Sequence, residues 1–231
     1  MTELPASNRR LVTCIVPVRD GARYLAQAID SILAQSYRPI EVIVVDDGST
    51  DESAHIADAY GDPVRLLTQA PSGAAAARNR AVRAAKGYLI APLDADDIWR
   101  PDKLTRQSNY LDAHPAVDIA MCRLETFHDP GPGDRRVIDG YPWVTALMRA
   151  HVFERVGYFD ESHQFANALD WFVRASEAGV QTARLPDVLV RRRIHAANVS
   201  AAPDREDRYF DDAAGILKQH LDRRRSAAAD R

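Results

Sequence analysis

The sequence predicts an α/β fold in which a mostly parallel, twisted sheet is flanked by helices, with a smaller region toward the C-terminus. Two observations support this class. Short apolar runs typical of buried strands alternate with segments whose apolar residues recur at helical spacing. The first run, Leu11 to Val18, is nearly continuous, as expected for a strand covered on both faces. A chain of 231 residues, 46% of them hydrophobic, is long enough to bury one sizeable core.

The first half of the chain follows a strand–helix rhythm. After the turn at Asp20–Gly21, an apolar stripe from Tyr24 to Leu33 predicts a helix that lies on the sheet and ends before Pro39. The elements expected next are strands at Ile40–Val45, Val64–Leu67 and Tyr88–Leu93, helices at Asp51–Tyr60, Ala74–Lys86 and Pro101–His114, and a strand at Val117–Cys122. Strands joined in this order by helices indicate parallel neighbours.

The second half is less regular. Phe127 to Gly140 is rich in Pro, Gly and Asp and predicts a loop, a candidate for a lid or an acceptor-side loop. We expect a helical stretch at Thr145–Val156, an amphipathic helix at Asp170–Ala178, an edge strand at Ala183–Arg192 and a last helix at Asp204–Leu221. This last helix is a candidate dimer surface.

Composition narrows the classes of function and the compartment. A formal net charge of -3 and a pI near 6.2 argue against a nucleic-acid partner, which usually requires a basic field. Cys14 and Cys122 lie in apolar runs without metal-type spacing, so we expect buried, reduced thiols and a cytoplasmic protein. No apolar run approaches the roughly 20 residues of a membrane-spanning helix, and residues 1–10 lack a signal-peptide core.

Two acidic clusters follow strand-like runs. Asp46, Asp47 and Asp51 come after the second strand, and Asp94, Asp96 and Asp97 come after the fourth. The carboxyl ends of parallel strands meet in one crevice, where converging carboxylates repel one another unless a cation lies between them. Oxygen ligands suit a hard divalent ion that also carries phosphates, which predicts a metal-dependent site for a nucleotide diphosphate. The alternative is that these aspartates only cap the helices that follow.

Several stretches together resemble the inverting nucleotide-sugar glycosyltransferases of family 2, which have the GT-A fold. The stretches are Ile15–Val18, Ser31–Tyr37, Glu41–Asp51, Ala77–Asn79 and Leu93–Asp97, and more weakly Val156–Glu161, Asp170–Trp171 and Ile194–Ser200. A lone Asp-x-Asp is a weak signal, whereas this ordered set is a strong one. The resemblance implies one GT-A domain over residues 1–231, with a nucleotide-sugar half at 11–122, an acceptor-side half at 123–203 and a C-terminal helix and tail at 204–231.

The resemblance also implies a donor site for a UDP-sugar. The residues it places against the donor are Pro17, Asp20, Asp46, Asp47, Arg78, Asp94 and Ala95. Asp46 corresponds to the acid that accepts a hydrogen bond from the uracil imide N–H. A buried acceptor of that kind selects uracil, because a mismatched base leaves polar groups unpaired.

By the same resemblance, Asp96 and His195 bind Mn²⁺ or Mg²⁺, and Asp94 lies toward the ribose or the metal. The alternative for His195, which follows three arginines, is an exposed loop residue. Two interpretations of Arg191 to Arg193 stay open. In one, the guanidinium groups close over phosphate, and in the other they form a solvated strand edge.

Asp170 corresponds to the general base. The family usually has Glu-Asp at this point, whereas this chain has Leu169–Asp170, which puts acceptor binding in doubt. The alternative for Asp170 is a helix N-cap. As base, Asp170 takes the acceptor's proton while the acceptor attacks the anomeric carbon from the face opposite the leaving nucleotide, which inverts the configuration.

The function expected is therefore transfer of a hexose from a UDP-sugar to a hydroxyl of a saccharide or a peptide side chain. Two alternatives stay open. A polyprenyl-phosphate sugar synthase uses a similar crevice with a lipid phosphate acceptor, and a non-catalytic protein binds the nucleotide sugar without turnover. A nucleotidyltransferase is disfavoured, because no glycine-rich, lysine-containing phosphate loop follows the first strand.

Overall fold

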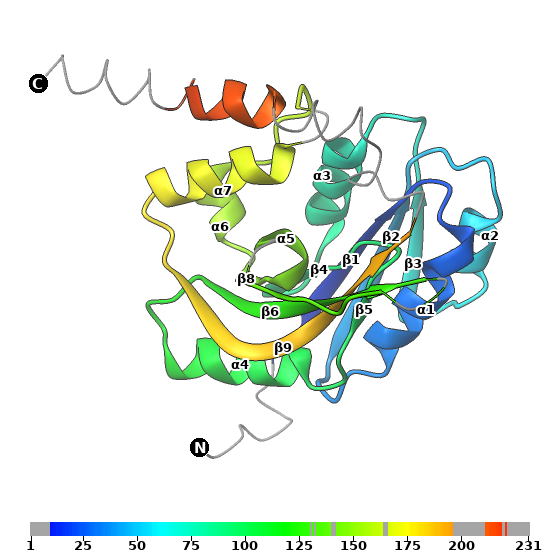
Figure 1. Cartoon of the computed structure of the whole chain (residues 1–231), viewed down its shortest axis with the longest axis horizontal. Helices are drawn as coiled ribbons and strands as arrows, with labels where there is room; N and C mark the ends of the chain where they lie inside the picture. Colours follow the sequence, from blue (N-terminus) through cyan, green and yellow to red (C-terminus); the bar gives the residue numbers. More distant parts are fainter. Residues whose placement is uncertain are drawn as a thin grey trace, which may run out of the picture.

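A computed structural model of the chain describes residues 10–129, 131, 133–139, 142–163, 166–195, 211–218 and 220. Among these residues, nine strands form one curled sheet with helices on its two sides (Figure 1). The strand order is β3-β2-β1-β4-β8-β6-β9-β5, and β7 pairs with β6 outside this path. The α/β class expected from the sequence is confirmed.

The first half of the sheet is parallel, as predicted. It contains β1 Val12–Val18, α1 Ala22–Leu33, β2 Ile40–Asp46, α2 Ser53–Asp58, β3 Val64–Thr68, α3 Ala74–Ala84 and β4 Leu89–Pro92. β1 lies between β2 and β4, with Val18 opposite Asp46 and Ile15 opposite Pro92. The chain therefore leaves β1, β2 and β4 at the same edge of the sheet, and that edge positions the site described below.

The second half extends the sheet with both parallel and antiparallel strand pairs. It contains β5 Ile98–Trp99, α4 Lys103–Ala113, β6 Ile119–His128, β7 Val137–Ile138, α5 Pro142–Thr145, β8 Leu147–Arg149, α6 Val152–Val156, α7 Asn167–Glu177 and β9 Thr182–Ile194. β8 is antiparallel to both β4 and β6 and so joins the two halves. Residues 211–218 and 220 are helical. The rest of the expected last helix, and the tail, lie outside the described residues.

Three predictions for the second half were wrong. The strand expected at an edge, β9, lies inside the sheet between β6 and β5. Its arginines suggested exposure, but Arg191 pairs with Glu125 at 3.1 Å and Arg193 pairs with Asp129, so their charges are satisfied within the protein. The stretch expected to be helical from Thr145 contains β8, and the loop expected from Phe127 includes the end of β6 and all of β7.

The core is continuous across both halves. Trp171 of α7 is fully buried, and its ring lies 4.9 Å from that of Phe153 and 5.6 Å from that of Phe159. Cys14 and Cys122 are buried and not disulfide-bonded, and burial raises the pKa of Cys14 to about 12. Among the described residues, no helix is both long and apolar enough to cross a membrane.

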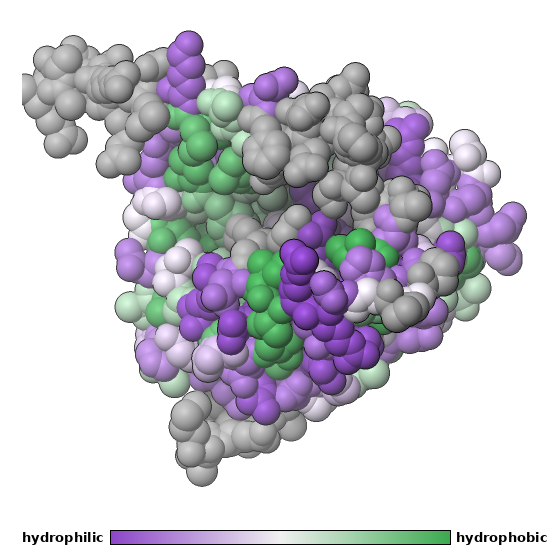
Figure 2. All heavy atoms as spheres, in the orientation of Figure 1, coloured by the Kyte–Doolittle hydropathy of each residue, from purple (hydrophilic) through white to green (hydrophobic). Residues whose placement is uncertain are grey.

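The outer surface is mostly hydrophilic in the view of Figure 2, with apolar side chains showing over α7 and over the β6–β9 ribbon. The helix at 211–218 lies against α7 (Figure 1). Ala213 and Ile216 pack there on Ala166 and Leu169. This contact covers part of the apolar face of α7.

Candidate active site at the strand ends

The two acidic clusters converge at the end of β1. Asp46 is the last residue of β2, and Asp94 and Asp96 follow β4 on the other side of β1. The backbone N–H of Leu93 donates to Ile15 O at 3.0 Å, and that of Asp47 donates to Val18 O at 2.8 Å. These bonds hold both clusters against β1, as expected for strand ends at one edge of a parallel sheet.

The turn after β1 is tied to the first cluster. Asp20 has a φ of 51°, and its Oδ1 accepts hydrogen bonds from Thr50 N at 2.7 Å and Thr50 Oγ1 at 3.1 Å. A Cβ placed on Gly21 would lie 2.7 Å from Val18 Cγ2 and 3.6 Å from Ala95 Cβ. Ala95 therefore lies close to this turn, and a side chain at position 21 would clash with Val18. Pro17 of β1 pairs with Val45 of β2 and is partly buried.

Asp46 has one carboxylate oxygen without a partner. The residue is 4% exposed, and its Oδ2 accepts a hydrogen bond from Ser49 N at 3.3 Å. Oδ1 is buried and accepts no hydrogen bond from the described residues. A buried acceptor left unpaired costs on the order of 1–3 kcal/mol, so a ligand N–H at this point would be stabilising.

Asp47 differs from Asp46, because both of its oxygens are occupied. Oδ1 accepts hydrogen bonds from Gln69 Nε2 and Ser72 N, and Oδ2 accepts one from Gly73 N, all at 2.8 Å. Its carboxylate thus fixes the loop between β3 and α3. Gly48, next in sequence, has a φ of 71°, and a Cβ there would meet Pro71 Cδ at 2.5 Å. The close approach of the two loops requires glycine at this position.

Arg78 of α3 reaches the second cluster. Its Nη2 lies 3.6 Å from Asp94 Oδ1, and its Nη1 donates to Asn167 Oδ1 at 2.5 Å. The guanidinium also lies over the ring of Trp143, 4.9 Å from the centroid. Burial lowers the pKa of Arg78, and Asp94 opposes this effect. Asn167 and Trp143 follow Arg78 by more than 60 positions, and no spacing pattern in the sequence links them to it.

The carboxylates after β4 crowd one another. Desolvation raises the pKa of Asp94, Arg78 opposes this rise, and Asp96 adds to it. Burial, followed by the charges of Asp96 and Asp94, raises the pKa of Asp97 well above its usual range. A cation among these groups would relieve the repulsion.

His195 is brought to this cluster by β9. Its Nε2 lies 3.0 Å from Asp96 Oδ2, and its ring lies 4.7 Å from that of Tyr24. Arg193, two residues before His195, is 3% exposed. Its Nε donates to Asp96 O at 3.0 Å, and its backbone N–H donates to Asp97 Oδ1 at 2.9 Å. Arg193 therefore fastens the end of β9 to the acidic turn, which neither interpretation of the arginine run had anticipated.

Asp96 and His195 have the chemistry of a divalent metal site. A carboxylate oxygen and an imidazole nitrogen converge there within 3.0 Å. Among the described residues, no group of three His, Cys, Asp or Glu side chains is placed to hold an ion. Two protein ligands suit Mg²⁺ or Mn²⁺ in a site where phosphate oxygens and water complete the coordination, so the residues present fit such an ion.

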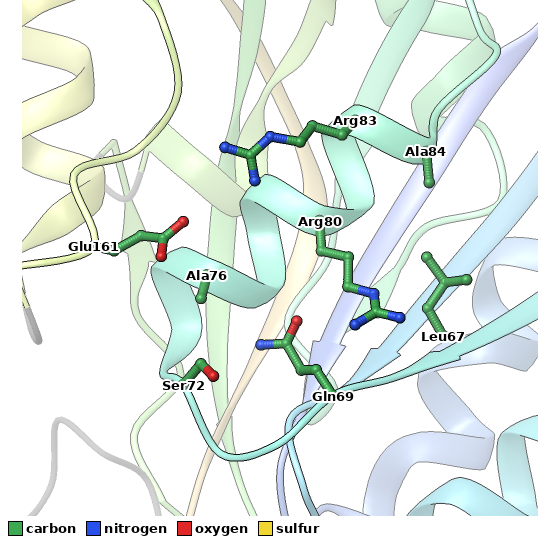
Figure 3. A pocket seen from close by; sticks show the side chains of 8 residues that line it. All are labelled: Leu67, Gln69, Ser72, Ala76, Arg80, Arg83, Ala84 and Glu161. Carbon is green, nitrogen blue, oxygen red and sulfur yellow. The ribbon is translucent and has the colours of Figure 1, made fainter.

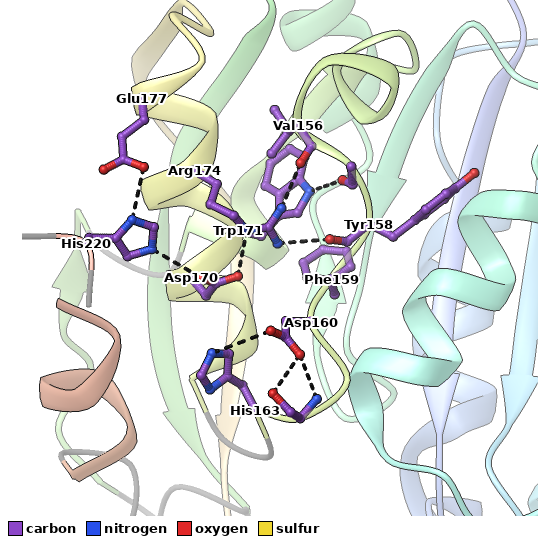
Figure 4. A network of polar contacts seen from close by, with 12 residues as sticks. Val156, Tyr158, Phe159, Asp160, His163, Asp170, Trp171, Arg174, Glu177 and His220 are labelled. Carbon is purple, nitrogen blue, oxygen red and sulfur yellow. Dashed lines mark hydrogen bonds and ion pairs between the residues drawn. The ribbon is translucent and has the colours of Figure 1, made fainter. Parts of the chain in front are cut away.

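Asp170 lies in a separate polar network of α7 (Figure 4). Its side chain is 6% exposed; Oδ2 accepts from Arg174 Nε at 2.8 Å, and Oδ1 lies 3.2 Å from His220 Nε2. His220 Nδ1 in turn lies 3.0 Å from Glu177 Oε2. Asp170 is in the first turn of α7, but Ala166 occupies the N-cap position. Its role as general base stays a prediction.

A hollow lies beside α3 (Figure 3). It has a volume of about 560 Å³ and is lined by Leu67, Gln69, Ser72, Ala76, Arg80, Arg83, Ala84 and Glu161. Gln69 and Ser72 of this lining donate hydrogen bonds to Asp47. The hollow therefore adjoins the loop that Asp47 holds at the end of β2.

Comparison with known proteins identifies the family of the chain. The model of glycosyl transferase family 2 matches residues 13–168, which is more than half of the chain. The chain belongs to this family. An uncharacterized glycosyltransferase of Rickettsia prowazekii, RP339, is 33% identical over 231 residues, which cover 90% of this chain and 72% of the relative. The chondroitin synthase of Pasteurella multocida is 30% identical over 208 residues, but they cover only 21% of that protein.

Solved structures show the same fold. Staphylococcus aureus TarS 1-349 in complex with UDP-GlcNAc has a TM-score of 0.70 and 20% identity, with 83% of this chain and 61% of that one covered. The mannosyltransferase PcManGT of Pyrobaculum calidifontis, in complex with GDP-Man and Mn²⁺, has a TM-score of 0.70 and 22% identity, covering 92% and 66%. The protein is a glycosyltransferase with the GT-A fold, as its sequence had indicated, and it spans only part of several relatives.

Proposed function

We propose that this glycosyltransferase moves a hexose from a UDP-sugar to a hydroxyl of a saccharide or a peptide side chain, with Mn²⁺ or Mg²⁺ bound. The observation that carries the proposal is the buried, unpaired Oδ1 of Asp46 at the same sheet edge as Asp94, Asp96 and His195. One end of the crevice thus offers an acceptor for a base, and the other offers ligands for a metal diphosphate. The two buried thiols suit the cytoplasm as the compartment.

Asp46 offers an acceptor for the imide N–H of uracil. Uracil presents one imide N–H between two carbonyl groups, whereas guanine presents N–H donors on two adjacent nitrogens to a carboxylate. Asp46 Oδ1 accepts no hydrogen bond from the described residues, and Oδ2 accepts one from Ser49 N. Oδ1 matches the single donor of uracil, whereas guanine would also have to share Oδ2 with Ser49 N. The donors held by relatives, UDP-GlcNAc and GDP-Man, are of both kinds.

The remaining residues of the site have different roles in the transfer. A bound divalent ion would supply Lewis-acid stabilisation of the charge that develops on the departing diphosphate. Asp96 and His195 would hold this ion, and Arg193 keeps them together through Asp96 O. Arg78, next to Asp94, offers a second positive charge at the diphosphate. The leaving group is therefore stabilised by groups already positioned in the folded chain.

Asp170 is the proposed base, and its surroundings define what that role requires. Both carboxylate oxygens are engaged, by Arg174 and by His220. An acceptor hydroxyl must share one of these oxygens with its present partner or displace that partner to deliver its proton, and inversion at the anomeric carbon follows if the hydroxyl attacks opposite the diphosphate. His220 comes from the C-terminal helix, so movement of that helix would open Asp170 to an acceptor.

The test is nucleotide release from a panel of UDP-sugars and GDP-mannose, with Mn²⁺, with Mg²⁺ and with a chelator. We expect metal-dependent hydrolysis of one UDP-sugar, none of GDP-mannose, and no hydrolysis by Asp96→Asn. Asp112→Asn, an exposed acid of α4, is the matched control and should behave as wild type. Turnover of GDP-mannose in preference to every UDP-sugar would contradict the uracil assignment, and binding of UDP without any turnover would favour a non-catalytic protein.

Asp170→Asn separates the proposed base from a structural acid. The variant keeps the shape of the side chain but cannot accept a proton, so we expect it to bind UDP as wild type does and to lose sugar transfer. Transfer at the wild-type rate by folded Asp170→Asn would remove Asp170 from the mechanism.

A further inference from the structure

The guanidinium of Arg78 is held between the two halves of the chain. Arg78 belongs to α3, but its closest hydrogen bond is to Asn167, the first residue of α7, 89 positions away. Nη1 donates to Asn167 Oδ1 at 2.5 Å, while Nη2 faces Asp94 Oδ1 at 3.6 Å. Trp143 lies against the guanidinium, 4.9 Å from centroid to Cζ. Three contacts from three segments therefore set the direction of one cation.

Asn167 is itself fixed. It is 1% exposed, and its Nδ2 donates to His163 O at 3.2 Å. Because a guanidinium has only donors and a carbonyl only accepts, the amide can satisfy both neighbours in one orientation, with Oδ1 toward Arg78. The chain thus presents a rigid, neutral acceptor to Arg78.

The neutrality of Asn167 matters because it leaves the positive charge of Arg78 available to a ligand. Of the two residues that face its terminal nitrogens, only Asp94 carries a charge, and its contact at 3.6 Å is longer than a hydrogen bond. Nε is buried and has no partner among the described residues. A carboxylate in place of the amide would pair with the guanidinium and compete with any anion that approaches it.

We propose that Asn167 is a positioning residue that aims Arg78 at the diphosphate of the donor and, being uncharged, leaves the cation available to it. This inference rests on the proposed function and deepens it, since it assigns a residue of the acceptor-side half to donor binding. It requires Asn167 to affect the phosphates and not the nucleoside.

The test compares UDP with uridine by calorimetry in the presence of Mn²⁺. Asn167→Asp keeps the shape and the acceptor but adds a charge, and Asn167→Ala removes the acceptor and lets Arg78 fall onto Asp94. For both variants we expect UDP to bind about tenfold more weakly, equivalent to about 1.4 kcal/mol, while uridine binds as it does to wild type. Asn109→Asp in α4 adds the same charge elsewhere and should change neither affinity.

Two outcomes would overturn the proposal. Unchanged UDP affinity in folded Asn167→Asp and Asn167→Ala would show that the amide does not act on Arg78's ligand. Equal losses for UDP and uridine would show that Asn167 merely supports the fold of the crevice. A wild-type chain that binds neither ligand would instead refute the proposed function and this inference with it, so the two failures are distinguishable.

Discussion

At the scale of the residue, the crevice separates aspartates that support the loops from those that are open to a ligand. Asp47 has its carboxylate filled by three donors of the β3–α3 loop, and Asp20 accepts two hydrogen bonds from Thr50. Asp46 keeps one oxygen unpaired, and Asp96 meets His195. Adjacent acids that look equivalent in sequence therefore have different tasks, because the surrounding donors differ.

We expect Asp96→Asn to weaken Mn²⁺ binding in the presence of UDP. The change removes one of the two protein ligands and its charge while keeping the shape of the side chain. A loss of tenfold or more is expected, by analogy with the 10- to 100-fold effects of residues that only support metal ligands. Titration followed by electron paramagnetic resonance measures free Mn²⁺ directly. Equal Mn²⁺ affinities for Asp96→Asn and wild type would exclude Asp96 as a ligand.

Lys103 gives a prediction for pH. It is fully buried in α4, donates to Ala146 O at 3.1 Å and lies over the ring of Trp99. Burial lowers its pKa from 10.5 to about 8. Between these pH values the unfolded chain holds a proton that the folded chain has released, so the free energy of unfolding rises with pH. Cys14, whose pKa is raised from 9.0 to about 12, acts in the opposite direction above pH 9.

Cys122, whose pKa burial also raises, acts in the same direction as Cys14, so a comparison with a variant that lacks only Lys103 is needed between pH 8 and 9. Relative to Lys103→Met, which cannot titrate, wild type should gain about 1 kcal/mol in its free energy of unfolding across this window. Urea denaturation at pH 8.0, 8.5 and 9.0 measures it. Parallel pH profiles for the two proteins would mean that Lys103 keeps an ordinary pKa.

At the scale of the element, α3 and α7 are connected through side chains and not through the sheet. Asn79 of α3 is 1% exposed and forms three hydrogen bonds with the segment before α7. Its Nδ2 donates to Phe159 O at 2.9 Å and to Glu161 Oε1 at 2.8 Å, and its Oδ1 accepts from Phe159 N at 2.8 Å. Together with the hydrogen bond from Arg78 to Asn167, this contact fastens α3 to α7 and to the segment that precedes it.

We expect Asn79→Ala to lower the free energy of unfolding by about 2–3 kcal/mol, because it leaves the buried N–H and C=O of Phe159 unpaired. Asn109→Ala, a partly buried position of α4, is the control and should cost less than about 1 kcal/mol. Urea unfolding of the three proteins provides the values. A loss for Asn79→Ala no larger than for the control would mean that the two elements are held together mainly by packing.

At the scale of the whole molecule, ligand and fold are coupled. Asp46 has an unpaired acceptor and the carboxylates after β4 repel one another, so a bound nucleotide and cation would stabilise both groups. Binding to the folded chain alone stabilises it by mass action, by about 2.7 kcal/mol at a ligand concentration 100 times the dissociation constant.

UDP with Mn²⁺ at that concentration should therefore raise the melting temperature by roughly 5 to 10 °C for a chain of this size. Excess chelator should abolish most of the rise, because the diphosphate then lacks its counter-ion. Scanning calorimetry provides the measurement, with GDP and Mn²⁺ as the comparison. An equal rise with GDP would argue against selection of uracil by Asp46.

Much of the fold follows from local patterns. Buried parallel strands require continuous apolar runs and short helical crossovers, so β1 to β4 and the helices between them were predicted to within a few residues. β8, β5 and the interior position of β9 were not predicted. β5 and β8 have only two and three residues, too few for a periodic signal, and the arginines of β9 are neutralised by Glu125 and Asp129, which lie far away in the sequence.

The family, the sheet edge at which the acids gather and the residue types available for chemistry could be inferred from the sequence, because buried parallel strands and the acidic turns after them follow local patterns. Which carboxylate oxygens are paired depends on the tertiary structure. Asp46 keeps an unpaired oxygen, Asp47 is filled by a loop, and Asp170 is held by Arg174 and His220. Those differences, like the pairing of Arg78 with Asn167, depend on donors supplied by distant segments, and no local pattern records them.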